Sequence, residues 1–111
     1  MKIQVITLFP EMLTGVFGNS MLWKAQDKAL VQLETVDLRQ FGLGPRKTVD
    51  DTPYGGGDGM LLKPEPLFAA VEYCKQSSPD ANVLLMTPRG YDYSQKDAER
   101  LAGEQRDVII I

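Results

Sequence analysis

The stretch RKTVDDTPYGGGDGM, residues 46–60, divides the sequence into two regions of regular apolar periodicity. It contains two adjacent carboxylates, a Pro-Tyr step and four glycines. Gly and Pro interrupt both helices and strands, so no regular element is predicted here. Because long irregular segments inside compact domains are usually functional or mobile, this segment is the first candidate site. The sequence on either side of it predicts the fold.

The N-terminal side predicts two strands separated by helices. Residues 3–9 (IQVITLF) form a β-branched apolar run typical of a buried strand. Pro10 suits the start of a helix, and Ser20 is the expected N-cap of a second, short amphipathic helix. Residues 31–38 (VQLETVDL) alternate apolar and polar side chains, which predicts a strand with one solvated face.

The C-terminal side alternates helices and apolar strands. Residues 67–75 have the spacing of a helix, with an expected buried face of Leu67, Phe68, Val71 and Cys74. A short strand follows at residues 83–86, and residues 87–90 (TPRG) form a loop at its end. Ser94 and Asp97 predict a capping box for a helix that runs to about Gly103, before a last strand at residues 107–111.

This order of elements predicts an α/β fold with a mostly parallel sheet and flanking helices. Open sheets of this kind bind ligands in loops at the carboxyl ends of their strands. The last apolar strand, residues 108–111, has no loop after it. We therefore expect residues 1–111 to be the N-terminal part of a larger α/β domain; the alternative is a small complete domain whose last element is a strand.

Composition limits the chemistry that this sequence supports. The 111 residues suit one domain, and the net charge of −3 leaves only a local basic patch for contact with nucleic acid. The chain has no histidine and one cysteine, which excludes Ser-His-Asp and Cys-His catalysis, His- or Cys-ligated zinc and an internal disulfide. No signal peptide or membrane-spanning run is visible, so a soluble cytoplasmic protein is expected.

The irregular segment allows several chemical interpretations. Its glycines fit neither a P-loop nor a dinucleotide fingerprint, but they permit positive φ and close approach of backbone N–H groups to a ligand. Asp50, Asp51 and Asp58 suit either Mg²⁺ or Asx turns. Arg46 and Lys47, with Arg39, suit either phosphate contact or an ordinary charged surface. A mobile surface turn is the structural alternative for the whole segment.

Several stretches together resemble the bacterial TrmD-type tRNA (guanine-N1)-methyltransferases. The long motif TVDDTPYGGGDGM, followed by LKPEPL, looks like the signature of that family. The segments ITLFPEM, DLRQF and VLLMTPRG are similar to the family in the same order. The resemblance covers all 111 residues.

The resemblance implies an activity, a cofactor and partners. Members of this family transfer a methyl group from S-adenosylmethionine to N1 of the guanosine 3′ of the tRNA anticodon. They are SPOUT-class homodimers, in which an α/β domain ends in a trefoil knot that binds the cofactor, and a helical C-terminal domain follows. The knot and that domain are absent from these 111 residues, so we expect the fragment to be inactive alone.

The resemblance also assigns roles by position. The first cofactor-contacting loop is matched by Leu85, Met86, Thr87, Pro88 and Gly90. The wall on the side of the target guanine and of the methionine part of the cofactor is matched by the loop of Gly56, Gly57 and Gly59. Asp50 and Arg46 are matched to tRNA handling, with Lys47 beside Arg46. The catalytic base and its arginine partner are expected beyond residue 111. No metal is expected.

This chain departs from many relatives at three of these positions. It has Asp58 where they have Pro or Ala, and Thr87 and Arg89 where they have Ser and Gln. Thr87 keeps the hydroxyl, whereas Arg89 changes the charge of the cofactor loop. Two functional alternatives remain: a non-catalytic α/β binding module, and a Mg²⁺-dependent nucleotide-binding enzyme that uses Asp50, Asp51 and Asp58.

Overall fold

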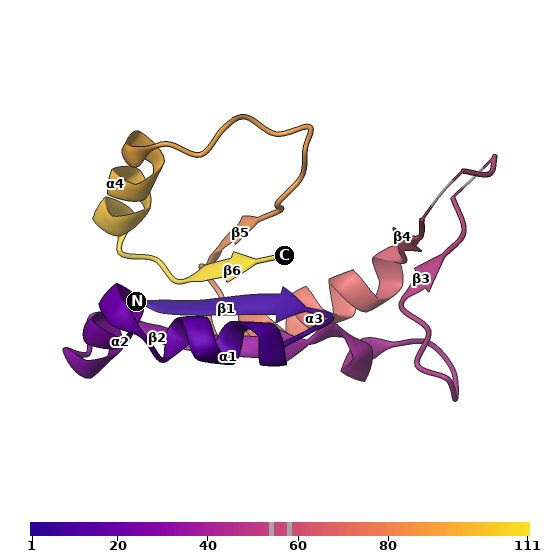
Figure 1. The fold of residues 1–111 in the computed structure, drawn as a ribbon, viewed down its shortest axis with the longest axis horizontal. Coiled ribbons are helices and arrows are strands. Elements are labelled where there is room, and N and C mark those ends of the chain that lie inside the picture. The colour runs from indigo at the N-terminus through magenta and orange to yellow at the C-terminus, as the bar shows by residue number, and fades with distance from the viewer. Residues whose placement is uncertain (54, 58) are drawn as a thin grey trace.

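The computed structural model describes residues 1–53, 55–57 and 59–111, and it is built on a four-stranded parallel sheet (Figure 1). Its strands are β1 (Lys2–Thr7), β2 (Gln32–Asp37), β5 (Asn82–Leu84) and β6 (Val108–Ile110). Their order is β2-β1-β6-β5, and each neighbouring pair is parallel. The predicted α/β class and parallel sheet are therefore confirmed.

Helices cover both faces of this sheet. Residues of α1 (Glu11–Phe17) and α2 (Ser20–Asp27) line a hollow with Leu33 of β2, and residues of α4 (Gln95–Glu104) line another with Ile3 and Val108. Ile3 pairs with both Leu33 and Val108, so these side chains share one face of the sheet. The opposite face, which includes Ile109, packs against α3 (Pro64–Ser77).

The buried stripe of α3 differs from the one predicted. Pro66, Ala70 and Cys74 are buried, whereas Phe68 is 69% exposed. The prediction that Cys74 belongs to the core is confirmed, and the prediction that Phe68 does is wrong. Small side chains at positions 70 and 74 let the helix approach the sheet closely, so the buried stripe lies two positions away from Phe68. The helix also begins earlier than expected, because Pro64 occupies its first turn.

Three further boundaries differ from the predictions. β1 ends at Thr7 and β5 at Leu84, earlier than the apolar runs that predicted them. Asn19, rather than Ser20, is the N-cap residue of α2. At α4 the prediction is confirmed, because Ser94 and Asp97 form both halves of a capping box.

The residues between β2 and α3 contain short elements that the sequence did not predict. A 3₁₀ helix, η1 (Leu38–Phe41), follows β2, and the side chain of Asp37 accepts a hydrogen bond from Arg39 N at its start. A small antiparallel hairpin pairs β3 (Asp50–Asp51) with β4 (Leu61–Leu62). Figure 1 shows this hairpin projecting away from the main sheet. Two-residue strands have too little periodicity to be visible in a sequence.

The carboxylate of Asp107, directly before β6, links that strand to β1 and to the C-terminal end of α3. Its Oδ1 accepts a hydrogen bond of 2.8 Å from the backbone N–H of Lys2, and its Oδ2 accepts one of 2.7 Å from the Ser78 hydroxyl. The bond from the Lys2 N–H, and next that from Ser78, hold the pKa of Asp107 below its usual range. This carboxylate therefore stabilises the folded state in its charged form.

The Asp107→Asn variant is expected to lose about 1 kcal/mol of unfolding free energy at neutral pH, since partial exposure screens the interaction. Because the folded-state pKa is lowered, this contribution is present above the unfolded pKa of about 3.9 and disappears as the pH falls through the folded value. Urea unfolding of both proteins between neutral and acidic pH measures the difference. The exposed Asp92→Asn variant is the control, and a gap that persists unchanged in acid would contradict the assignment.

Candidate functional site

The loop at residues 85–90 leaves the sheet at the carboxyl end of β5, where the sequence placed it. Met86 N donates to Ile111 O over 3.0 Å, which fixes the start of the loop to the central part of the sheet. The Thr87 side-chain oxygen accepts from Arg89 N at 3.3 Å, and the Thr87 carbonyl accepts from Gly90 N at 3.2 Å. The loop is therefore a closed turn organised by Thr87, with its outer surface exposed.

A hollow of about 230 Å³ lies between this loop and α4. Leu85, Met86 and Thr87 form one side, and Asp97 and Arg100 of α4 contribute the polar part of the other. Sequence reasoning did not assign these two α4 residues to a site. The only sequence signal was the Ser-x-x-Asp pattern, which indicated a helix cap rather than the wall of a hollow.

The glycine loop has the backbone that its composition predicted. Four glycines adopt positive φ: Gly55 at 82°, Gly56 at 86°, Gly57 at 127° and Gly59 at 82°. An added Cβ at any of these positions meets nothing within 4 Å, so glycine is needed here for conformation and not for space. Asp58, a candidate Mg²⁺ ligand, lies outside the described residues.

The two acidic residues of β3 do not converge. Asp50 and Asp51 are neighbours in a strand, so their side chains point to opposite sides. Asp51 accepts a hydrogen bond from Thr52 N and lies 3.5 Å from Lys63 Nζ; these two contacts, in that order, lower its pKa. Among the described residues, no group of three His, Cys, Asp or Glu side chains is placed to hold a metal ion. The described geometry therefore gives the magnesium alternative no support.

Arg46 and Lys47 lie at the tip of a tight turn. Leu43 and Thr48 close this turn through two backbone hydrogen bonds of 2.8 and 2.9 Å. Lys47 adopts a φ of 51°, which is uncommon for a residue other than glycine. The turn presents both basic side chains to solvent, beside the strand that contains Asp50.

The structure keeps the 85–90 loop apart from the glycine loop. The hollow beside residues 85–90 is lined by the β5 loop and α4, whereas a second hollow of about 620 Å³ lies at the base of the glycine loop. This second hollow is lined by described residues of the hairpin and of the start of α3, including Asp51, Gly55, Lys63 and Glu65. Neither hollow takes a described residue from the other group. The described residues thus form two partial surfaces and no closed pocket between them.

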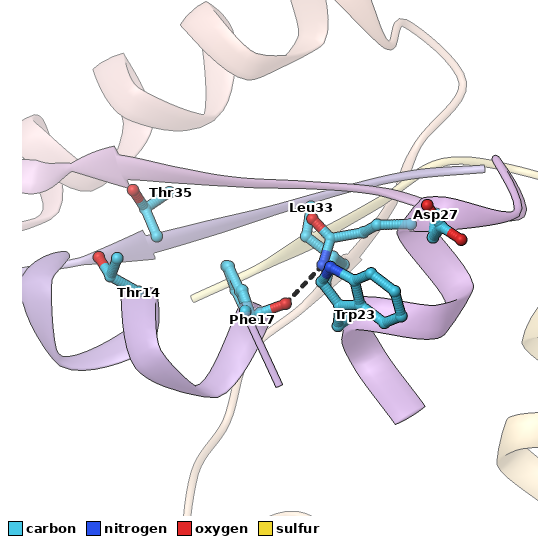
Figure 2. Close-up of a pocket in the computed structure, with 8 residues that line it drawn as sticks. Thr14, Phe17, Trp23, Asp27, Leu33 and Thr35 are labelled. Carbon is cyan, nitrogen blue, oxygen red and sulfur yellow. Dashed lines mark hydrogen bonds between the residues drawn. The ribbon is translucent and has the colours of Figure 1, made fainter. Parts of the chain in front are cut away.

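The hollow between α1, α2 and β2 has a volume of about 540 Å³, and the sequence did not predict it (Figure 2). Phe17 and Trp23 flank it, and Gln26 holds the end of α1 by donating a hydrogen bond of 2.6 Å to Phe17 O. It lies between α1, α2 and β2, away from both predicted surfaces. The described residues also include no helix with the length and apolar character needed to cross a membrane.

Comparison with known proteins identifies the family. The sequence profile described as tRNA (Guanine-1)-methyltransferase TrmD matches residues 1–111. The proteins named tRNA (guanine-N(1)-)-methyltransferase from Geobacillus kaustophilus and Bacillus cereus are 50% and 49% identical to the chain, over 99% of its length in each case. The match covers 45% and 46% of those proteins, so the chain spans less than half the length of these curated relatives.

The fold agrees with that match. The crystal structure of tRNA (m1G37) methyltransferase from Aquifex aeolicus superposes with a TM-score of 0.87 and 33% identity. The superposition covers 100% of this chain and 50% of the Aquifex chain. Profile, sequence identity and backbone geometry all agree along the whole chain: it belongs to the TrmD family of tRNA (guanine-1)-methyltransferases.

Proposed function

We propose that residues 1–111 are the N-terminal part of a single α/β methyltransferase domain that transfers a methyl group from S-adenosylmethionine to N1 of the guanosine 3′ of the tRNA anticodon. The observation that supports this most directly is the family match over the whole chain, together with the placement of residues 85–90 at the end of a parallel strand. The trefoil knot and helical C-terminal domain would be supplied by residues that follow in the complete enzyme.

The chemistry of residues 85–90 fits part of S-adenosylmethionine. Leu85 and Met86 are 63% and 66% exposed and offer apolar surface to an adenine or thioether group. The Thr87 N–H and the Gly90 carbonyl, which the bond from Gly90 N to Thr87 O does not use, offer backbone polar groups. The adjacent hollow of about 230 Å³ is smaller than the roughly 300–1,000 Å³ of typical ligand sites. We therefore assign cofactor contact to Leu85, Met86, Thr87, Pro88 and Gly90, and the rest of the site to residues beyond these.

When bound, S-adenosylmethionine would supply an electrophilic methyl group to guanine N1, leaving the sulfur as a neutral thioether, and the N1 proton would pass to a base. A carboxylate suits that base. The resemblance to the family implies that this base lies beyond residue 111. This chain's contribution is to bind and orient, through the cofactor loop on one side and the glycine hairpin on the other.

The tRNA side is assigned to the hairpin region. Gly56, Gly57 and Gly59 let backbone N–H groups approach the target nucleotide, while Arg46 offers charge to the phosphate backbone. Asp50, half-buried in β3, is assigned to tRNA handling. A homodimer in the cytoplasm is part of the same proposal, and it accommodates the net charge of −3 because tRNA contacts are shared with other parts of the enzyme.

A chimaera tests this function. Residues 1–111 are joined to the C-terminal part of the Geobacillus kaustophilus relative, and calorimetry with S-adenosylhomocysteine is run beside residues 1–111 alone. We expect the chimaera to bind and to methylate tRNA at guanine N1, and the short chain to bind weakly and show no turnover. Turnover by residues 1–111 alone would contradict the expectation that catalysis needs residues beyond 111. Failure of a folded chimaera to bind would favour the alternative of a non-catalytic binding module.

Replacing Gly90 by alanine separates ligand contact from folding. A Cβ at Gly90 meets Thr87 O at 3.5 Å and Thr87 Cγ2 at 3.7 Å, which are ordinary contacts, so the thermal midpoint should change little. Cofactor affinity of the chimaera should fall about tenfold, because the methyl group occupies space beside the ligand. Calorimetry and thermal unfolding of the same samples measure both effects. Unchanged affinity in G90A would remove Gly90 from the cofactor site.

A further inference from the structure

The segment between β5 and α4 forms an arch (Figure 1). One side-chain hydrogen bond joins the middle of this arch to α4. The Tyr91 hydroxyl donates to Asp97 Oδ1 over 3.1 Å. Tyr91 directly follows Gly90, the last residue of the cofactor loop. Asp97 lies in the first turn of α4, so this bond connects the far end of the loop to a regular element.

Asp97 is held firmly enough to act as an anchor. Its Oδ2 accepts from the Ser94 backbone N–H at 2.9 Å and from the Ser94 hydroxyl at 3.0 Å. Arg100 Nη2 lies 3.8 Å from Oδ1. The Ser94 N–H, and after it the Ser94 and Tyr91 hydroxyls, lower the pKa of Asp97, so it remains a charged acceptor at neutral pH. Oδ2 therefore accepts the hydrogen bonds of the helix cap, and Oδ1 accepts the bond from the arch, with Arg100 beside it.

The near end of the loop is fixed independently. Met86 is bonded to the end of β6, and Thr87 closes the turn to Gly90. Tyr91 is 78% exposed, so burial of its ring does little to fix the far end. Tyr91 instead contacts α4 through its hydroxyl, which donates to Asp97 and lies beside Arg100, so polar contacts with α4 direct the chain after Gly90.

We propose that Tyr91 and Asp97 are positioning residues that hold the 87–90 loop in the conformation that receives S-adenosylmethionine. This inference rests on the proposed function. A loop already ordered in its binding conformation loses less entropy when the ligand binds, so the brace acts on cofactor affinity. It acts through the loop: both side chains point to each other, and neither is assigned contact with the reacting atoms.

Tyr91→Phe tests the brace, because it removes the bond to the arch and leaves both Ser94–Asp97 bonds in place. In the chimaera, we expect the KM for S-adenosylmethionine to rise about fivefold, with kcat and the KM for tRNA unchanged. In residues 1–111 alone, the Gly90 amide should exchange with solvent faster, while the thermal midpoint stays the same. Asp97→Asn, which keeps an oxygen acceptor, should give a smaller rise.

Tyr73→Phe is the matched control. Tyr73 lies on α3, outside the hollow, is 53% exposed, and its ring, whose centroid lies 5.5 Å from that of Phe41, is retained in the variant. Equal KM values for Y91F and Y73F, or a Y91F loss that falls equally on kcat and on the thermal midpoint, would overturn the proposal. An unsubstituted chimaera that fails to bind cofactor would overturn the proposed function, and this role with it. If the unsubstituted chimaera binds the cofactor but the Gly90 amide exchanges at the same rate in Y91F as in the parent chain, the positioning role of Tyr91 and Asp97 is disproved and the proposed function is not.

Discussion

Replacing Ile109 by alanine is expected to lower the free energy of unfolding by about 2–5 kcal/mol, the largest effect of any single truncation that we predict. Ile109 is 0% exposed and lies in β6, one of the two inner strands of the sheet. It pairs with Gln4 on one side and Val83 on the other, and it belongs to the same buried cluster as Ala70 and Cys74 of α3. The substitution therefore leaves a cavity where the sheet meets α3.

The size of this effect follows from how thin the core is. The buried cluster around Ile109 consists of Val, Leu and Ile residues and of small side chains. Few large residues are therefore available to move into the space. Unfolding free energies of domains this small are about 5–15 kcal/mol, so the loss removes a substantial fraction of the total. Urea unfolding followed by circular dichroism measures it.

Val83→Ala provides the matched control. Val83 lies directly beside Ile109 in the register and on the same face, but it is on the edge strand β5 and 40% exposed. Its truncation should cost well under half as much, about 1 kcal/mol or less. Similar losses for the two variants would show that α3 does not seal this face around Ile109.

The sequence predicted elements well where periodicity was long, and poorly where contacts between distant residues decide the structure. Apolar runs located the strands, and the Ser94–Asp97 spacing located the start of α4. The side of α3 that is buried was misjudged at Phe68, because close packing against the sheet favours the small Ala70 over the larger ring. Periodicity alone does not contain that choice.

The candidate site shows the same division. The 85–90 loop was predicted in the right place, because loops after parallel strands have a fixed location in the fold. The bond between Tyr91 and Asp97 was not foreseen, since it depends on how an irregular arch returns to α4. The β3–β4 hairpin was also missed: its pairing is set by the register of Asp50 with Leu62, and two-residue strands leave no pattern.

The second large effect is expected at Gly42, where alanine should destabilise the protein by about 3 kcal/mol. A Cβ built on Gly42 would collide with the carbonyl carbon and oxygen of Lys47. Those atoms belong to backbone in a closed turn, bonded through Leu43 and Thr48, so they have no flexible side chain that could yield. The φ of Gly42 is −64°, so the penalty is one of space and not of backbone conformation.

The Gly42 turn leads directly into the tRNA side of the proposed site. Val49 follows the turn, is 4% exposed, and accepts a hydrogen bond of 2.7 Å from Lys63 N at the start of α3. Forcing the turn open should displace Val49 and with it β3, including Asp50. In the chimaera, G42A is therefore expected to weaken tRNA binding more than cofactor binding, which filter binding and calorimetry measure separately.

Gly103→Ala is the opposite case and tests the steric argument by its sign. An added Cβ at Gly103 meets nothing within 4 Å, and Gly103 lies inside α4, where alanine is favoured over glycine by up to about 1 kcal/mol. G103A should therefore raise the thermal midpoint while G42A lowers it, although both make the same chemical change. If G42A left both the midpoint and tRNA binding unchanged, the turn would have to relax without cost. The close approach of Gly42 to Lys47 would then not be what shapes the surface proposed to contact tRNA.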